Sequence, residues 1–129
     1  MKEPLSVSIG QENIVELKIS GSLSLDRLPA LRADIEKAEL VIREMHDRTG
    51  RKVRVLIDIT EFDGVYDVGA ITAMTEFAKA DERFVQRTAS FGGPDNAKIS
   101  GEVVTGLAGR NNIKVFASKA DALDWLTKS

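Results

Sequence analysis

The densest group of side chains that could do chemistry lies within ten consecutive residues. Its polar members are Asp58, Thr60, Glu61, Asp63, Tyr66 and Asp67. Carboxylates at such a density can hold a divalent cation or act as an acid and base pair. However, their spacing matches no calcium-binding loop, and the segment contains no histidine or cysteine. Solvated turn carboxylates and one helix cap explain the segment better than a metal or catalytic site does.

The other reactive residue types form no catalytic constellation. His46 is the only histidine and cysteine is absent, so the usual pairs of nucleophile and base cannot form. Ser90 precedes Phe91-Gly92-Gly93 but lacks the flanks of a nucleophile elbow. These glycines also lack the Gly-Lys-Ser/Thr ending of a phosphate-binding loop. The sequence therefore predicts no enzyme, no metal and no cofactor.

Length and composition predict one folded domain that spans residues 1–129. The chain is 43% hydrophobic and 29% charged, with 18 basic and 20 acidic residues and a net charge of −2. This balance gives no overall field to attract nucleic acid or an anionic membrane. The absence of cysteine fits a reducing compartment, and no apolar run approaches the ~20 residues that span a bilayer. We expect a cytoplasmic protein with no transmembrane segment.

Two regular elements and a long helix precede the acidic segment. Apolar residues alternate over 5–9 and over 14–20, with a short connector that contains Gly10, so we expect an antiparallel hairpin. The apolar spacing then changes to three and four residues, which predicts a helix. The apolar positions of this helix are Leu28, Leu31, Ile35, Ala38, Ile42 and Met45. Ser24 or Asp26 is expected to cap its start, with Pro29 in its first turn and Gly50 at its end.

The second half of the chain alternates strands and helices. Val53 to Ile59 is nearly continuous in apolarity, as expected of a central strand covered on both faces. A loop through Phe62 and Gly64 is expected next, followed by a helix from Val68 to Arg83 that Asp67 caps. The remaining pattern predicts a strand at 84–91, a helix at 97–107, a strand at 113–116 and a helix at 118–127. Ser118 and Asp121 form a partial capping box at the start of the last helix.

The predicted order of elements is ββαβαβαβα. Helical crossovers between successive later strands imply parallel pairing, whereas the opening hairpin is antiparallel. We therefore expect a single-domain α/β fold with a mixed sheet of about five strands and helices packed on it.

Two parts of the chain resemble the STAS family, which comprises sulphate transporter and anti-sigma factor antagonist domains. Val55 to Ile71, with the sequence VLIDITEFDGVYDVGAI, is similar to the central motif of that family. Ile113 to Phe116, followed by Asp121 to Leu126, is similar to the closing strand and helix of a bacterial subgroup called stage II sporulation protein AA-like (SpoIIAA-like). The resemblance covers most of the chain and implies the fold predicted above.

The resemblance also implies a switch position. In regulatory STAS domains, a serine at the start of the helix is phosphorylated by a partner kinase. Counting from Asp58 places the family glycine at Gly69, the switch serine at Asp67 and the preceding aspartate at Tyr66. The phosphorylatable serine is thus replaced by a carboxylate, which either caps the helix or imitates the phosphorylated state. The hydroxyl of Thr60 lies nearby in sequence but not at the motif position.

Two functions of different classes follow from the resemblance. The first is a non-enzymatic regulatory module that binds a protein partner, or another copy of itself, through Asp58, Thr60, Tyr66, Asp67 and Gly69. The second is a carrier or sensor of a small apolar or lipid-like ligand, because the subgroup also resembles CRAL-TRIO lipid-transfer proteins. The residues that could line its pocket are Met74, Phe77, Phe84, Phe91 and Val104, although such side chains ordinarily fill a core.

Overall fold

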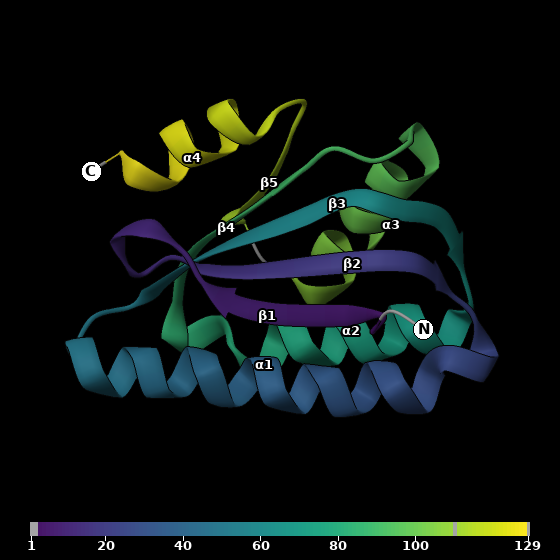
Figure 1. Cartoon of the computed structure of the whole chain (residues 1–129), viewed down its shortest axis with the longest axis horizontal. Coiled ribbons are helices and arrows are strands. Elements are labelled where there is room, and N and C mark those ends of the chain that lie inside the picture. The colour runs from purple at the N-terminus through teal and green to yellow at the C-terminus, as the bar shows by residue number, and fades with distance from the viewer. Residues whose placement is uncertain (1–2, 110, 129) are drawn as a thin grey trace.

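The protein contains one five-stranded sheet with strand order β1-β2-β3-β4-β5, as the computed structural model shows for residues 3–109 and 111–128 (Figure 1). The strands are β1 (Leu5–Ile9), β2 (Val15–Leu23), β3 (Val53–Tyr66), β4 (Val85–Phe91) and β5 (Ile113–Phe116). β1 pairs antiparallel with β2, and every other pair is parallel. The predicted hairpin and mixed sheet are therefore confirmed.

Helices cover both faces of this sheet. They are α1 (Leu28–Thr49), α2 (Val68–Ala80), α3 (Asp95–Ala108) and α4 (Lys119–Thr127). α4 lies alone on one face, and the other three lie on the opposite face (Figure 1). Each helix follows a strand that runs toward the same edge, so all four helices begin at the edge where β2 to β5 end. No helix in the described part of the chain is long and apolar enough to cross a membrane.

Two clusters of buried side chains hold these layers together. The larger cluster joins the sheet to α1 and α2 and includes Leu17 and Val55. The smaller one joins Leu56 and Phe91 of the sheet to Leu126 of α4. Successive residues of a strand face opposite sides, so Val55 and Leu56 enter different clusters. This arrangement explains why the sequence of β3 is almost continuously apolar.

The central strand extends farther than its sequence pattern indicates. The predicted loop through Phe62 and Gly64 is wrong, because β3 continues to Tyr66 and pairs with a β2 that runs to Leu23. The pairing shifts register between Lys18 and Ser20 and again between Gly21 and Leu23. Such irregularities interrupt the alternation of side chains, which is the signal by which a strand is recognised.

The ends of the first helix differ in how well they were predicted. A 3₁₀ turn, Leu25–Arg27, precedes α1, and Arg27 occupies the N-cap position without a side-chain cap. The predicted cap by Ser24 or Asp26 is wrong, because Ser24, just before that turn, donates its hydroxyl to the Asp26 carboxylate at 2.5 Å. Pro29 in the first turn and left-handed Gly50 after the last turn are confirmed.

Later helix boundaries shift by two or three residues. α2 ends at Ala80 instead of Arg83, because a 3₁₀ turn, Glu82–Phe84, leads into β4. α3 begins at Asp95, two residues before the prediction. At α4 the Ser118 hydroxyl accepts a hydrogen bond from the Asp121 amide at 3.2 Å, which confirms the predicted N-cap.

Candidate functional site

Residues 65–69, which we call the β3–α2 segment, join the central strand to α2 at the edge where the parallel strands end. Tyr66 pairs with Leu23 at the end of β2. The next amide, that of Asp67, donates to the Leu23 carbonyl at 2.8 Å. The segment is therefore attached to two neighbouring strands before the helix begins.

Asp67 caps α2, as the sequence predicts. Its carboxylate oxygen Oδ2 accepts a hydrogen bond from the Gly69 amide at 2.7 Å. A Cβ atom at position 69 would lie 2.9 Å from that oxygen and 2.9 Å from Leu28 Cδ2. Glycine therefore leaves room for both the capping carboxylate and the packing of α1 against α2. The carboxylate also lies at the positive end of the helix dipole, which stabilises its charge.

Large apolar side chains are exposed around this cap. Val68 is 79% exposed, Val65 56% and Tyr66 41%. Leu25, which is 67% exposed, follows the strand partner of Tyr66 by two residues. A single exposed apolar residue is ordinary, whereas the four residues here lie close to one another at one edge of the sheet.

The carboxylates next to the segment are engaged by neighbouring groups. Asp63 accepts hydrogen bonds from the Ser22 hydroxyl at 2.5 Å and from the Val65 amide at 2.8 Å, and these bonds lower the pKa of its carboxyl. Lys18 forms an ion pair with Glu61, and the hydrogen bond from this contact raises the pKa of the lysine. Within the part of the chain that the structure describes, no group of three metal-binding side chains is present.

Asp58 and Thr60 lie apart from the β3–α2 segment. Asp58 Oδ1 accepts hydrogen bonds from the Thr60 amide at 2.9 Å and from the Thr60 hydroxyl at 2.6 Å. The strand between Thr60 and Tyr66 covers about 20 Å at ~3.3 Å per residue. The structure thus brings Tyr66, Asp67 and Gly69 together and places the other two candidates elsewhere on β3.

An apolar cavity of about 110 Å³ lies between the sheet and the helices α2 and α3. Met74, Phe77 and Val104 line it, three of the five residues proposed from the sequence for an apolar pocket. Tyr66 also reaches its wall, so the cavity adjoins the β3–α2 segment. The other apolar lining residues are Leu17, Ile19, Leu23, Val55, Ile57, Ile59, Phe62, Ile71, Ala78, Ile113 and Val115.

Phe84 and Phe91 pack elsewhere. The Phe84 ring meets His46 edge-on, with 5.2 Å between ring centroids, and the Arg83 guanidinium lies 4.9 Å from its centre. Phe91 belongs to the smaller cluster with Leu56, on the α4 face of the sheet. Neither ring lines the cavity.

Sequence reasoning missed the polar part of the cavity wall. Thr88 and Ser90 of β4 line it, together with Asp81 and Thr105. The available signal was the alternation in β4, where Thr88 and Ser90 share one face while Ala89 and Phe91 take the other. Thr88 and Ser90 thus place two hydroxyl groups on the face of β4 that borders the cavity.

Comparison with known proteins gives a family and a fold. A family model described as SpoIIAA-like matches residues 14–127. A search of curated proteins gave no significant match. A solved structure of an uncharacterized DUF3478-family protein with a SpoIIAA-like fold, from Shewanella loihica PV-4, aligns with a TM-score of 0.67 and 22% identity. That alignment covers 98% of this chain and 96% of the other. The anti-sigma factor antagonist SpoIIAA, in its unphosphorylated form, aligns with a TM-score of 0.62 and 12% identity over 97% of this chain and 99% of its own.

Proposed function

Because this chain belongs to the SpoIIAA-like family, we propose that it is a non-enzymatic regulatory module that binds a protein partner through the β3–α2 segment. One protein of similar fold is described as an anti-sigma factor antagonist, a name that implies action on another protein. The observation that carries the proposal is the exposure of Val65, Tyr66 and Val68 around a helix start that is held in place.

The segment is preorganised for docking. Three hydrogen bonds hold it: Val65 N to Asp63 Oδ1, Asp67 N to the Leu23 carbonyl, and Gly69 N to Asp67 Oδ2. A surface that is already ordered loses little conformational entropy when a partner binds. Burying an exposed valine such as Val68 contributes about 1.5–3 kcal/mol to association. Fixed geometry and available apolar area therefore both favour binding at this edge.

The residue at position 67 makes the proposed surface constant. A serine at this position could be switched by phosphorylation, whereas the aspartate presents a carboxylate without any modification. Its carboxylate already satisfies the Gly69 amide, a role that needs no partner. We therefore propose a docking surface that is always in one state, with Asp67 acting first as a cap.

The decisive test changes the most exposed residue of the segment. Val68→Asp places a charge where apolar contact is proposed, and Leu40→Asp makes the same kind of change on α1, at a side chain that is 58% exposed. Both variants and the unchanged protein would be used for affinity capture from the native cells. Each candidate partner would then be purified and its Kd measured directly. We expect Val68→Asp to weaken the purified complex at least about tenfold, equivalent to ~1.4 kcal/mol.

The control separates docking from general surface effects. Leu40→Asp should bind the purified partner as tightly as the unchanged protein does. If no captured protein forms a complex with the purified chain, or if both variants weaken it equally, the β3–α2 segment is not the docking surface.

A second candidate function rests on the apolar cavity. We propose, as the alternative, a carrier or sensor of a small apolar ligand between the sheet and α2. An apolar cavity of about 150 Å³ accommodates benzene, so a volume of about 110 Å³ limits the ligand to about six carbon atoms in this conformation. The hydroxyls of Thr88 and Ser90 on the wall could orient one polar group of that ligand.

Ligand binding can be tested without knowing the natural ligand. Native mass spectrometry of freshly purified protein would reveal a molecule that copurifies. Benzene should raise the Tm of the unchanged protein but not that of Val104→Phe, whose ring would fill the cavity. Leu123→Phe, on the α4 face, introduces the same ring away from the cavity, so this control should still respond. An equal response from all three proteins would mean that benzene acts elsewhere.

A further inference from the structure

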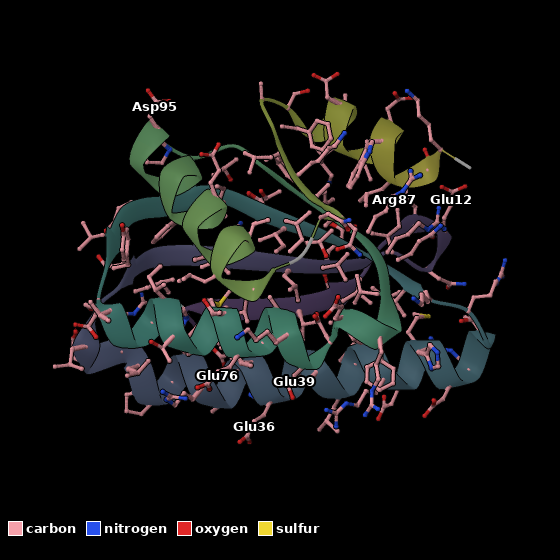
Figure 2. The ribbon with its side chains drawn as sticks, turned by 180° about the vertical axis from the view of Figure 1, so that it is seen from behind. Glu12, Glu36, Glu39, Glu76, Arg87 and Asp95 are labelled. Atoms are coloured by element: carbon pink, nitrogen blue, oxygen red, sulfur yellow. The ribbon has the colours of Figure 1, made fainter. Side chains whose placement is uncertain are left out.

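A second concave site lies at the edge where the parallel strands begin, opposite the β3–α2 segment. Its walls come from the β1–β2 connection, the end of α1, the starts of β3 and β4, and the end of α4. Figure 2 shows Glu12 and Arg87 close to this edge beside α4, and Asp95 at the opposite end of the molecule. The volume of about 540 Å³ falls within the range of ~300–1,000 Å³ typical of small-molecule pockets. We call this site the basic pocket.

The charged residues around this pocket are mainly cationic. Arg51, Lys52, Arg54 and Lys128 line it, and Glu12 is the one acidic residue among the described lining residues. Four positive charges and one negative charge give a local excess of three, in a chain whose net charge is −2. Since the chain as a whole repels anions weakly, the excess is a property of this site.

Helix ends alone do not account for these cations at α1. Basic residues often complement the negative end of a helix by bonding to its last carbonyls. At the end of α1, however, the Thr49 hydroxyl donates to the Met45 carbonyl at 2.9 Å and the Gly50 amide donates to the His46 carbonyl at 2.9 Å. Neither donor is one of the four cations of the pocket.

At the end of α4, carbonyl groups likewise accept hydrogen bonds from a residue that does not line the pocket. Arg87 Nη1 donates to the Trp125 carbonyl at 2.6 Å and to the Lys128 carbonyl at 3.1 Å. The Arg87 guanidinium also stacks over the Trp125 ring, 5.2 Å from its centre. Arg87 is not a lining residue, so the pocket cations are additional to those that stabilise the helix end.

The pocket cations retain hydrogen-bonding capacity. Arg54 Nη2 donates to the Glu12 carbonyl at 3.0 Å, which uses one of the five donors of a guanidinium. This contact also fixes the Arg54 side chain against the β1–β2 connection. Lys128 Nζ lies 3.6 Å from an Asp124 carboxylate oxygen, longer than a charge-assisted hydrogen bond of about 2.8 Å. Arg51 and Lys52 are exposed at the rim.

We propose that the basic pocket binds a small molecule that carries a phosphate group. Guanidinium groups match the geometry of phosphate oxygens, and lysines add compact positive charge. The site is concave and walled by five segments of the fold, which suits a small molecule better than the flat surface of a membrane. The proposal is independent of partner docking, since the two sites lie at opposite edges of the sheet.

Inorganic pyrophosphate is a suitable probe because it presents phosphate chemistry alone. In a titration of the ¹⁵N-labelled full chain, we expect saturable shifts at the amides of residues 51–54 and 126–128 and none at residues 65–69. Lys52→Glu should weaken binding at least about tenfold, the size expected for losing a charge-assisted contact. Lys37→Glu, on the exposed surface of α1, changes the net charge by the same amount and should leave the affinity unchanged.

Three results would overturn the proposal. One is an equal loss of affinity in Lys52→Glu and Lys37→Glu, which would indicate nonspecific charge attraction. Another is the absence of saturable shifts at the pocket amides. The third is binding to phosphatidylglycerol vesicles without binding to pyrophosphate, which would assign the cations to a membrane surface. Lys128→Gln gives a milder second variant should Lys52→Glu fold poorly, and Val68→Asp should bind pyrophosphate normally whether or not it binds a protein partner.

Discussion

The two edges of the sheet carry opposite kinds of chemistry. All four helices begin at the edge where β2 to β5 end, and carboxylates such as Asp67 and Asp95 stand at helix starts there (Figures 1 and 2). The helices end at the other edge, where Arg87 binds the last carbonyls of α4. Helix dipoles favour this separation of negative and positive side chains. Much of the charge pattern therefore follows from the fold.

The residues that inform about function are those that the capping of helix ends does not explain. At the first edge, capping accounts for Asp67 but not for the exposed Val65 and Val68. At the second edge, Arg87 accounts for the end of α4 but not for the basic pocket. Comparing the two edges separates residues that stabilise the fold from residues that are left to bind something.

The largest effect is expected for Arg87→Ala at the second edge. The change removes two charge-assisted hydrogen bonds to the carbonyls of Trp125 and Lys128 and a cation–π contact. We expect the free energy of unfolding to fall by about 3 kcal/mol, measured by urea denaturation. Arg87→Lys keeps the charge but loses the fork of donors, so its free energy of unfolding should lie between those of Arg87→Ala and the unchanged protein. A loss below about 0.5 kcal/mol would mean that the pocket cations also stabilise the end of α4. These cations could then not be separated from the residues that stabilise the fold.

A left-handed glycine lies at each edge, and substituting each of them gives the next test. Gly93 has φ +78°, and a Cβ there would lie 2.6 Å from the Ile59 carbonyl oxygen. Gly50 has φ +68°, and a Cβ there would have no atom of the described residues within 4 Å. Gly50→Ala should cost about 1 kcal/mol from its left-handed conformation, and Gly93→Ala about 2 kcal/mol because a steric clash is added. If both variants lose the same stability in thermal unfolding, the loop before α3 must move and relieve the clash at Gly93 without an energetic penalty.

Most of the fold was predictable from the sequence because local patterns and tertiary packing agree. Most of the apolar stripe of α1 is buried, and so are Val53, Val55, Leu56 and Ile59 of the nearly continuous apolar run in β3. Failures occurred where a partner strand decides the structure. β3 continues to Tyr66 because β2 pairs with it through two register shifts, which no single-strand pattern reveals. The 3₁₀ turns before α1 and before β4 are each three residues long, too short for the apolar spacing that predicts a helix.

The candidate sites were less predictable, for a geometric reason. Tyr66, Asp67 and Gly69 adjoin in sequence, so their proximity follows from the chain itself. The cavity draws its walls from four strands and two helices, and two of its hydroxyl groups, those of Thr88 and Ser90, belong to β4. The basic pocket combines segments more than seventy residues apart, such as Arg54 and Lys128. Sites of this kind require the fold before they can be recognised.

A smaller effect is expected at the helix start of the first edge. Asp67→Ala removes the acceptor of the Gly69 amide and should lower the free energy of unfolding by about 1 kcal/mol. Asp67→Asn retains an acceptor but removes the charge, so it should cost only a few tenths of a kcal/mol, roughly the dipole contribution. If residue 67 acts only as a helix cap, Asp67→Asn should bind the purified partner with the same affinity as the unchanged protein. Weaker binding by Asn at unchanged stability would show that the charge itself is recognised.

The smallest effect is a pH dependence at Asp63, beside the same edge. Hydrogen bonds from the Ser22 hydroxyl and the Val65 amide lower the pKa of this carboxyl below its ordinary value of 3.8. The unfolded chain therefore binds more protons near that pH, and the contribution to stability is present above pH 3.8 and is lost as the pH falls through the folded pKa. The group is exposed, so solvent screening limits the contribution to roughly 0.3 kcal/mol. In urea unfolding, the difference between the unchanged protein and Asp63→Asn should be largest near neutral pH and shrink in acid. A difference that grows in acid would mean that these bonds do not favour the ionised carboxylate.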